Sequence, residues 1–273
     1  MVEFSRYRML PALRAIIAGP VITAAGSLPW SILVVLNIKY GKSLPWASVL
    51  MAVYLAIFLR YLNGWGPPRS TSATRKTLLR ARGLSTSAWR WALAAGGSAN
   101  AALAAVFIVV SRFGWIHRSR AAIPPTSPWT VAVWLLTGAA VAGIAEECGF
   151  RGYMQKMLEE RYGATVAIAV TSAVFGAIHL SHGFSVAILF DVAWGAVYGA
   201  LAYFTGSILP SLVLHASLDA LEFFLLWRFA APSPPPLVKL DSPAWFAMAM
   251  GTVLAVFAFW SFHSLYHLRG PKS

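Results

Sequence analysis

The chain has 273 residues, of which 58% are hydrophobic and 11% charged, with a mean hydropathy of +0.65. Soluble domains carry about 25% charged residues, so this composition excludes a water-soluble globule and indicates a membrane protein. The net charge of +13 would suggest nucleic-acid binding in a soluble protein. Here the basic residues lie between apolar runs, as in loops that flank membrane helices, so we expect membrane lipids as partners and no nucleic acid.

Eight apolar runs of about 20 residues follow one another along the chain. A run of this length crosses the roughly 30 Å hydrocarbon core as an α-helix. The sequence therefore predicts an all-α, polytopic membrane protein with about eight transmembrane helices, forming a single membrane domain over residues 1–273. The expected spans are Ile16–Leu36, Leu44–Leu62, Trp89–Val110, Pro128–Phe150, Gly163–His179, Phe184–Phe204, Ile208–Phe229 and Pro243–Leu265.

The first run follows three arginines and contains small residues at 24–26, a combination that also occurs in secretory signal peptides. It stays apolar well beyond that point, through Leu36, which favours a retained first span. Of the 22 Lys and Arg residues, 15 fall on the side of the N-terminus and 7 on the opposite side of the expected spans. By the positive-inside rule, both termini are expected in the cytoplasm.

Acidic residues are few, yet several fall where a charge is costly. An ionisable group inside a bilayer costs about 3 kcal/mol or more. Glu146 and Glu147 lie at the end of the fourth expected span, in a helical pattern that can continue to about Leu158. Residues four apart share a helix face whereas adjacent ones point about 100° apart, so Glu147 can pair with Arg151. Glu146 then needs a partner from another helix.

Other expected spans carry further polar groups. His179 ends the fifth run, and the seventh holds His215 and Asp219 at i and i+4 on one face, with Glu222 close to the same stripe. Asp191, in the sixth run, has no assigned role. Cys148 is the only cysteine and is interpreted as a small residue at a helix contact.

Three motifs therefore follow in order on the fourth, fifth and seventh expected helices: Glu146-Glu147-x-x-x-Arg151, Phe175-x-x-x-His179 and His215-x-x-x-Asp219. This series resembles the CPBP family of CAAX proteases and bacteriocin-processing (Abi-type) enzymes. The string from Glu146 to Gly152 matches the EExxFRG form of the family's first motif. The resemblance covers residues 128–229, the expected catalytic core, and leaves residues 1–127 as N-terminal transmembrane helices.

The resemblance implies an intramembrane endopeptidase whose catalytic cavity lies inside the bilayer. It assigns Glu146 as the general base and His179 as its partner in holding the attacking water. His215 and Asp219 would stabilise the oxyanion, although many relatives carry Asn in place of Asp219. Glu147, Arg151 and Glu222 are expected to support these residues structurally. The implied substrate is a membrane-associated or C-terminal peptide segment, which is prenylated in eukaryotic relatives and a peptide, membrane anchor or bacteriocin-related target in many bacterial ones.

Two alternatives stay open. Glu146, His179 and His215 could bind zinc with water in the fourth position, as in metalloproteases, although HExxH is absent. We expect no cofactor and a glutamic-type mechanism, with zinc as the alternative. The same intramembrane acids could instead serve a transporter or proton-coupled carrier, which paired broken helices and inverted repeats would favour.

Overall fold

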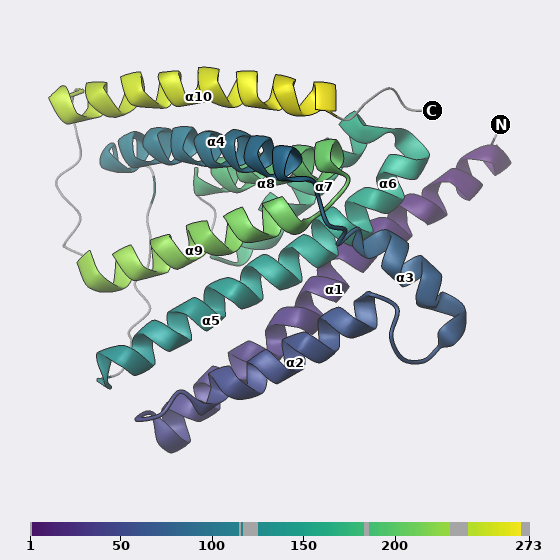
Figure 1. Ribbon diagram of the computed structural model, residues 1–273, viewed down its shortest axis with the longest axis horizontal. Helices are drawn as coiled ribbons and strands as arrows, with labels where there is room; N and C mark the ends of the chain where they lie inside the picture. Colours follow the sequence, from purple (N-terminus) through teal and green to yellow (C-terminus); the bar gives the residue numbers. More distant parts are fainter. Residues whose placement is uncertain (1, 115, 117–124, 183–185, 230–239, 269–273) are drawn as a thin grey trace. The chain divides into compact units, whose positions relative to one another are not determined.

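The computed structural model describes residues 2–114, 116, 125–182, 186–229 and 240–268 (Figure 1). These residues form helices and no strand. The helices are α1 (Val2–Gly41), α2 (Trp46–Leu62), η1 (Arg69–Thr71), α3 (Ser72–Leu79), α4 (Thr86–Arg112), α5 (Pro128–Glu146), η2 (Glu147–Met154), α6 (Gln155–Tyr162), α7 (Ala164–Ile178), η3 (His179–His182), α8 (Ala187–Thr205), α9 (Leu209–Phe229) and α10 (Ser242–Leu268).

All eight predicted spans correspond to helices, and the first two residues of the sixth span, 184 and 185, lie outside the described residues. Within the described residues, six helical stretches are long and apolar enough to cross a membrane, and the longest, Pro128–Tyr162, joins α5, η2 and α6. The other two predicted spans are the shorter apolar helices α2 and α7. α2 begins only after Pro45, and α7 gives way at His179 to a tighter 3-10 turn. The prediction of an all-α, polytopic membrane protein is thus confirmed.

The helices group into two compact units. The first contains α1, α2, α3, α5, η2, α6 and α9 from His215 onward. The second contains α4, α7, α8, α10 and the start of α9. The expectation of a single membrane domain concerns the chain as a whole and stays a prediction.

In the first unit, α1 packs against α2, α5 and η2 (Figure 1). The side chain of Asn37 organises one end of this packing. Its Nδ2 donates to the carbonyl oxygens of Gly41 and Leu44, each at 2.8 Å, which shapes the turn between α1 and α2. Its Oδ1 accepts from the backbone N–H of Ala47 at 3.0 Å and from Nε1 of Trp134 at 3.2 Å. One buried amide therefore ties α5 to the α1–α2 hairpin.

Small residues let the helices of the first unit approach closely, as is common in membrane proteins. A Cβ added at Gly26 of α1 would lie 2.6 Å from the Cβ of Ala145 in α5. A Cβ at Gly149 of η2 would lie 2.5 Å from the carbonyl oxygen of Gly19 in α1. The backbone around residues 145–149 is thus held directly against α1.

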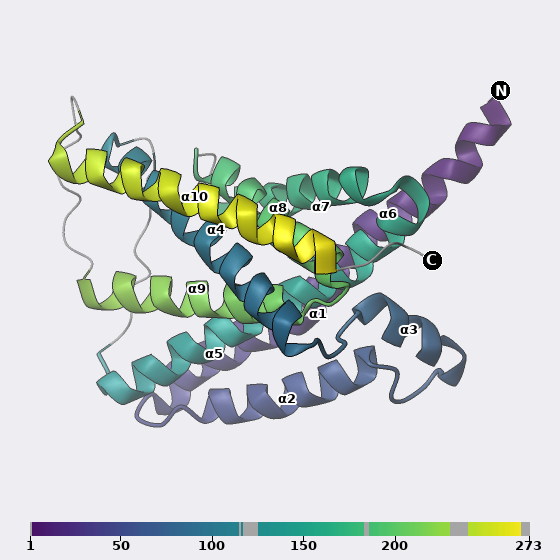
Figure 2. The same ribbon diagram turned by 45° about the horizontal axis from the view of Figure 1, so that its top comes forward.

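In the second unit, α10 lies along α4 (Figure 2). Trp91 of α4 meets Trp260 of α10 edge to face, with ring centroids 4.9 Å apart, an arrangement that aromatic pairs prefer. Arg112, at the end of α4, donates two hydrogen bonds to Asp241, at 2.9 and 2.7 Å. The guanidinium of Arg112, together with the backbone N–H of Ala244, lowers the pKa of the Asp241 carboxyl.

The contact between α5 and α9 is expected to be intolerant of a single added methyl group. A Cβ at Gly143 would lie 2.8 Å from the Cβ and 2.9 Å from the backbone nitrogen of Ala216. Gly143→Ala is therefore expected to destabilise the protein by about 1–3 kcal/mol through overpacking. The measurement is the thermal unfolding midpoint of the purified protein in detergent.

Gly97→Ala is the matched control, because a Cβ at this position of α4 would meet only Leu214 at 4.0 Å, an ordinary contact. Alanine favours helix over glycine, so this variant is expected to unfold at or slightly above the wild-type midpoint. Equal midpoints for the Gly143 variant and the wild type would contradict the close α5–α9 contact.

Candidate active site

The predicted first motif lies in a widened part of the long helix. The helix continues past Arg151, as predicted, but residues Glu147–Met154 form a π-helix, in which the hydrogen bonds close over five residues instead of four. Every residue of this segment is buried. Short π-helical segments within α-helices often occur at functional sites. The hydropathy pattern of the sequence did not predict this one.

Glu147 and Arg151 form the ion pair that helical spacing predicted. Nη1 of Arg151 lies 3.1 Å from Oε1 of Glu147, and both side chains are 0% exposed. A fully buried charge is tolerated only when it is paired and hydrogen-bonded. Each of these two buried charges therefore has its counter-ion on the same helix.

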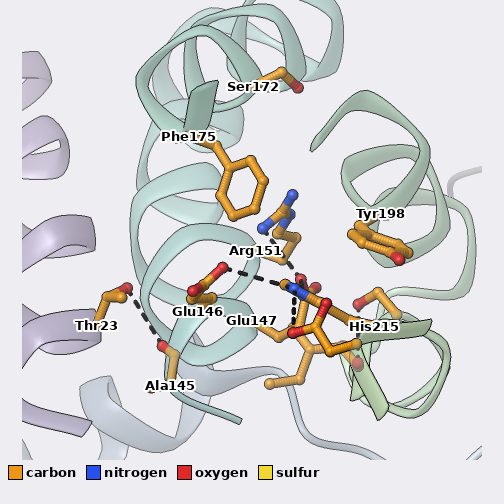
Figure 3. Close-up of polar contacts among 12 residues, drawn as sticks. Thr23, Ala145, Glu146, Glu147, Arg151, Ser172, Phe175, Tyr198 and His215 are labelled. Atoms are coloured by element: carbon orange, nitrogen blue, oxygen red, sulfur yellow. Dashed lines mark hydrogen bonds and ion pairs between the residues drawn. The ribbon is translucent and has the colours of Figure 1, made fainter. Parts of the chain in front are cut away.

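The third motif contacts the first through the side chain of His215 on α9. Its Nδ1 lies 2.9 Å from Oε1 of Glu147 (Figure 3). An ionised carboxylate oxygen only accepts hydrogen bonds, so Nδ1 carries the proton in this contact. The Glu147 carboxylate thereby fixes the orientation of the ring and leaves Nε2 as the nitrogen that points to other groups.

Nε2 of His215 lies near two further carboxylates. It is 3.7 Å from Oε2 of Glu146 (Figure 3). It is 3.6 Å from Oδ2 of Asp219. These separations exceed a direct hydrogen bond but lie within the range of an ion pair. Glu146, which the sequence left without a partner in its own helix, therefore finds His215 on α9.

The side chains of the two adjacent glutamates differ in how much of their surface is exposed. The side chain of Glu146 is 16% exposed, whereas that of Glu147 is 0% exposed. Asp219 is 20% exposed and His215 only 7%. Glu146 and Asp219 are thus the partly exposed carboxylates of this group, and Glu147 is fully buried.

Backbone contacts hold the two helices of this group together. Ala216, next to His215, sits against Gly143, one turn before Glu146 and Glu147. On the other side, the hydroxyl of Thr23 in α1 donates to the carbonyl oxygen of Ala145 at 3.4 Å (Figure 3). The glutamates are therefore fixed between α1 and α9.

Two further predicted site residues, His179 and Glu222, lie at the start of η3 and on α9. His179 belongs to the second unit, where its Nδ1 donates to the carbonyl oxygen of Phe175 at 2.8 Å. A carbonyl can only accept, so a neutral His179 ring has its lone pair on Nε2. Glu222 follows Asp219 on α9, and Asp191 lies in α8.

The structure places Glu146, Glu147, Arg151, His215 and Asp219 in one cluster, entirely within the first unit. Helical spacing predicted the contacts within each helix. The contact of His215 with Glu147 was missed, because no spacing rule relates residues on two different helices. Across the part of the chain that is described, no group of three or more His, Cys, Asp or Glu side chains is arranged to hold a metal ion.

Comparison with known proteins supports the class suggested by the cluster. Residues 128–221, about a third of the chain, match the family model described as type II CAAX prenyl endopeptidase Rce1-like. The match spans all three motifs and confirms the resemblance that they predicted. It supports an intramembrane endopeptidase, in keeping with the multi-pass helices. Searches of curated proteins and of solved structures found no match to the chain.

Proposed function

We propose that this protein hydrolyses a peptide bond of a membrane-associated or C-terminal peptide segment, with Glu146 as the general base. The observation that carries the proposal is the His215 ring, held by Glu147 at Nδ1 while Nε2 faces the accessible carboxylates of Glu146 and Asp219. The family match over residues 128–221 supports the same reaction class.

In the proposed reaction, Glu146 takes a proton from a water molecule whose oxygen attacks the peptide carbonyl carbon. The proton then passes to the leaving amine as the C–N bond breaks. His179 is the proposed second contact of the water, a role taken from the resemblance. Its Nδ1 bond to Phe175 supports this role, because it leaves Nε2 of a neutral ring as the acceptor.

His215 is proposed to stabilise the oxyanion of the tetrahedral intermediate. When both ring nitrogens are protonated, Nδ1–H stays with Glu147 and Nε2–H is directed toward the space beside Glu146 and Asp219. A preorganised donor of this kind typically contributes about 3–4 kcal/mol to the transition state. Asp219 would hold the cationic ring in place, and Glu222 would support it one turn further along α9.

The proposal places this site in a cavity within the bilayer and both termini in the cytoplasm. The excess of Lys and Arg on the N-terminal side supports the orientation. A lipidated or membrane-anchored tail is the proposed substrate, because such a peptide is already concentrated at the membrane.

The substrate test compares the C-termini of membrane proteins in cells that carry the wild-type protein or its Glu146→Ala variant. The expected result is a set of tails that stay uncleaved only with the variant. Identical C-termini in both cell lines, with equal amounts of the two proteins in the membrane, would contradict the proposal.

Metal removal tests the proposed glutamic mechanism against the zinc alternative. Cleavage by the purified protein is expected to stay within about twofold of its starting rate after chelation and dialysis, because the proposed base is a carboxylate that needs no metal-bound water. The measurement is the initial rate before chelation, after chelation and after adding back Zn²⁺. Loss of cleavage that Zn²⁺ restores would instead favour a site built from Glu146, His179 and His215.

A further inference from the structure

Two histidines lie next to each other on α10, which belongs to the second unit, whereas the cluster around His215 belongs to the first. His263 and His267 are separated by one helical turn and both are exposed. Their Nε2 atoms lie 3.1 Å apart. Neither residue belongs to the three motifs, and the proposed peptidase mechanism makes no use of them.

The separation of the two nitrogens suits a shared metal ion. Imidazole nitrogens bind Zn²⁺ at about 2.0–2.1 Å. Two nitrogens 3.1 Å apart would then subtend an angle of about 100° at the metal, between the about 90° of a square-planar site and the about 109° of a tetrahedral one. The helix thus sets the distance that chelation requires.

The arrangement of the two imidazole rings also suits a shared metal ion. The ring centroids are 4.5 Å apart and the rings are inclined at 82°. If the two rings lay in one line with the same distance between their Nε2 atoms, their centroids would be farther apart than this. The two rings are therefore inclined, and their Nε2 atoms point toward the same side. In the metal-free protein one ring can donate Nε2–H to the other, and moving that proton to Nδ1 leaves both Nε2 lone pairs available.

We propose that His263 and His267 form a chelating site for a divalent transition-metal ion, with water completing the coordination. Imidazole suits Cu²⁺, Ni²⁺ and Zn²⁺, and the Irving–Williams order makes Cu²⁺ the tightest of the three. Binding would join two successive turns at the end of α10 and stabilise them against fraying. The site is independent of the proposed peptidase activity.

The test uses the full-length protein in detergent, stripped of metal and titrated with Cu²⁺. The comparison variant exchanges two neighbours, His267→Leu with Leu268→His, which keeps the composition but turns the second imidazole about 100° around the helix. Leu268 is 50% exposed and His267 is exposed, so the exchange changes two side chains at the surface of the protein. A Ser264→Ala variant, which leaves both histidines in place, serves as the second control.

The wild type and the Ser264 variant are expected to bind one equivalent of Cu²⁺ at least about tenfold more tightly than the exchanged variant, since chelation needs both imidazoles on one face. Electron paramagnetic resonance should show two equatorial nitrogens in the wild type, and Cu²⁺ should raise its unfolding midpoint but not that of the exchanged variant. Equal affinities and spectra for the wild type and the exchanged variant would overturn the proposal. Metal-free cleavage is expected to be the same in all three proteins, so failure of this site leaves the proposed peptidase function untouched.

Discussion

Replacing Glu146 with Gln is expected to lower the kcat of peptide cleavage by about 10²–10⁴-fold, the usual contribution of a general base. The amide has the same shape as the carboxylate and can still face Nε2 of His215, so the packing of α5 against α9 is expected to survive. The loss would therefore come from the missing proton acceptor. The measurement is the cleavage rate at saturating substrate, alongside the unfolding midpoint.

Glu160→Gln is the matched control for this change. Glu160 lies on α6, in the same continuous helix, where its side chain is 54% exposed and pairs with Lys156 at 3.1 Å. Exposed pairs contribute little to stability, so this variant is expected to cleave and unfold like the wild type. Full activity in the Glu146 variant would show that the base is another group.

Replacing Arg151 with Met is expected to produce the largest loss of stability, about 3–5 kcal/mol, because it leaves the buried carboxylate of Glu147 without its cation. Methionine fills much of the same volume, so the loss would reflect the uncompensated charge more than a cavity. Denaturant unfolding of the purified protein in mixed micelles measures the effect.

The double variant Glu147→Gln with Arg151→Met separates charge from packing. Removing both charges is expected to recover a large part of the lost stability, and the coupling between the two sites follows from the cycle of single and double variants. A single Arg151 variant within about 0.5 kcal/mol of the wild type would show that Glu147 is neutral or otherwise compensated.

The parts of this site that sequence could predict are those governed by distance along one helix. The i and i+4 spacing predicted that Glu147 would reach Arg151 and that His215 would share a face with Asp219, because a helix fixes which residues are neighbours. Hydropathy predicted the helices themselves, because the thickness of the bilayer sets the length of an apolar run.

The contacts between helices could not be predicted in this way. His215 meets Glu147 more closely than Glu146. This depends on how α9 lies on α5, where Ala216 comes close to Gly143. The sequence assigned Glu147 only to Arg151, whereas the structure gives its carboxylate two partners, Arg151 and His215. No pattern within one helix contains that information.

The π-helical turns of η2 have a consequence for how related sequences should be compared. A π-helical turn equals the insertion of an extra residue into an α-helix, and every residue that follows is turned by about 100° relative to a regular helix. Where this segment begins, Glu146 and Glu147 face His215 of α9, while after it Glu159 faces Arg80, whose Nη1 lies 2.6 Å from its Oε2. In a relative that lacks one residue between positions 147 and 154, the helix could keep the contacts of the glutamates with His215 or the contact of Glu159 with Arg80, but not both. Alignments of this helix should therefore allow a gap there, and such a gap would mark a relative whose site is supported differently.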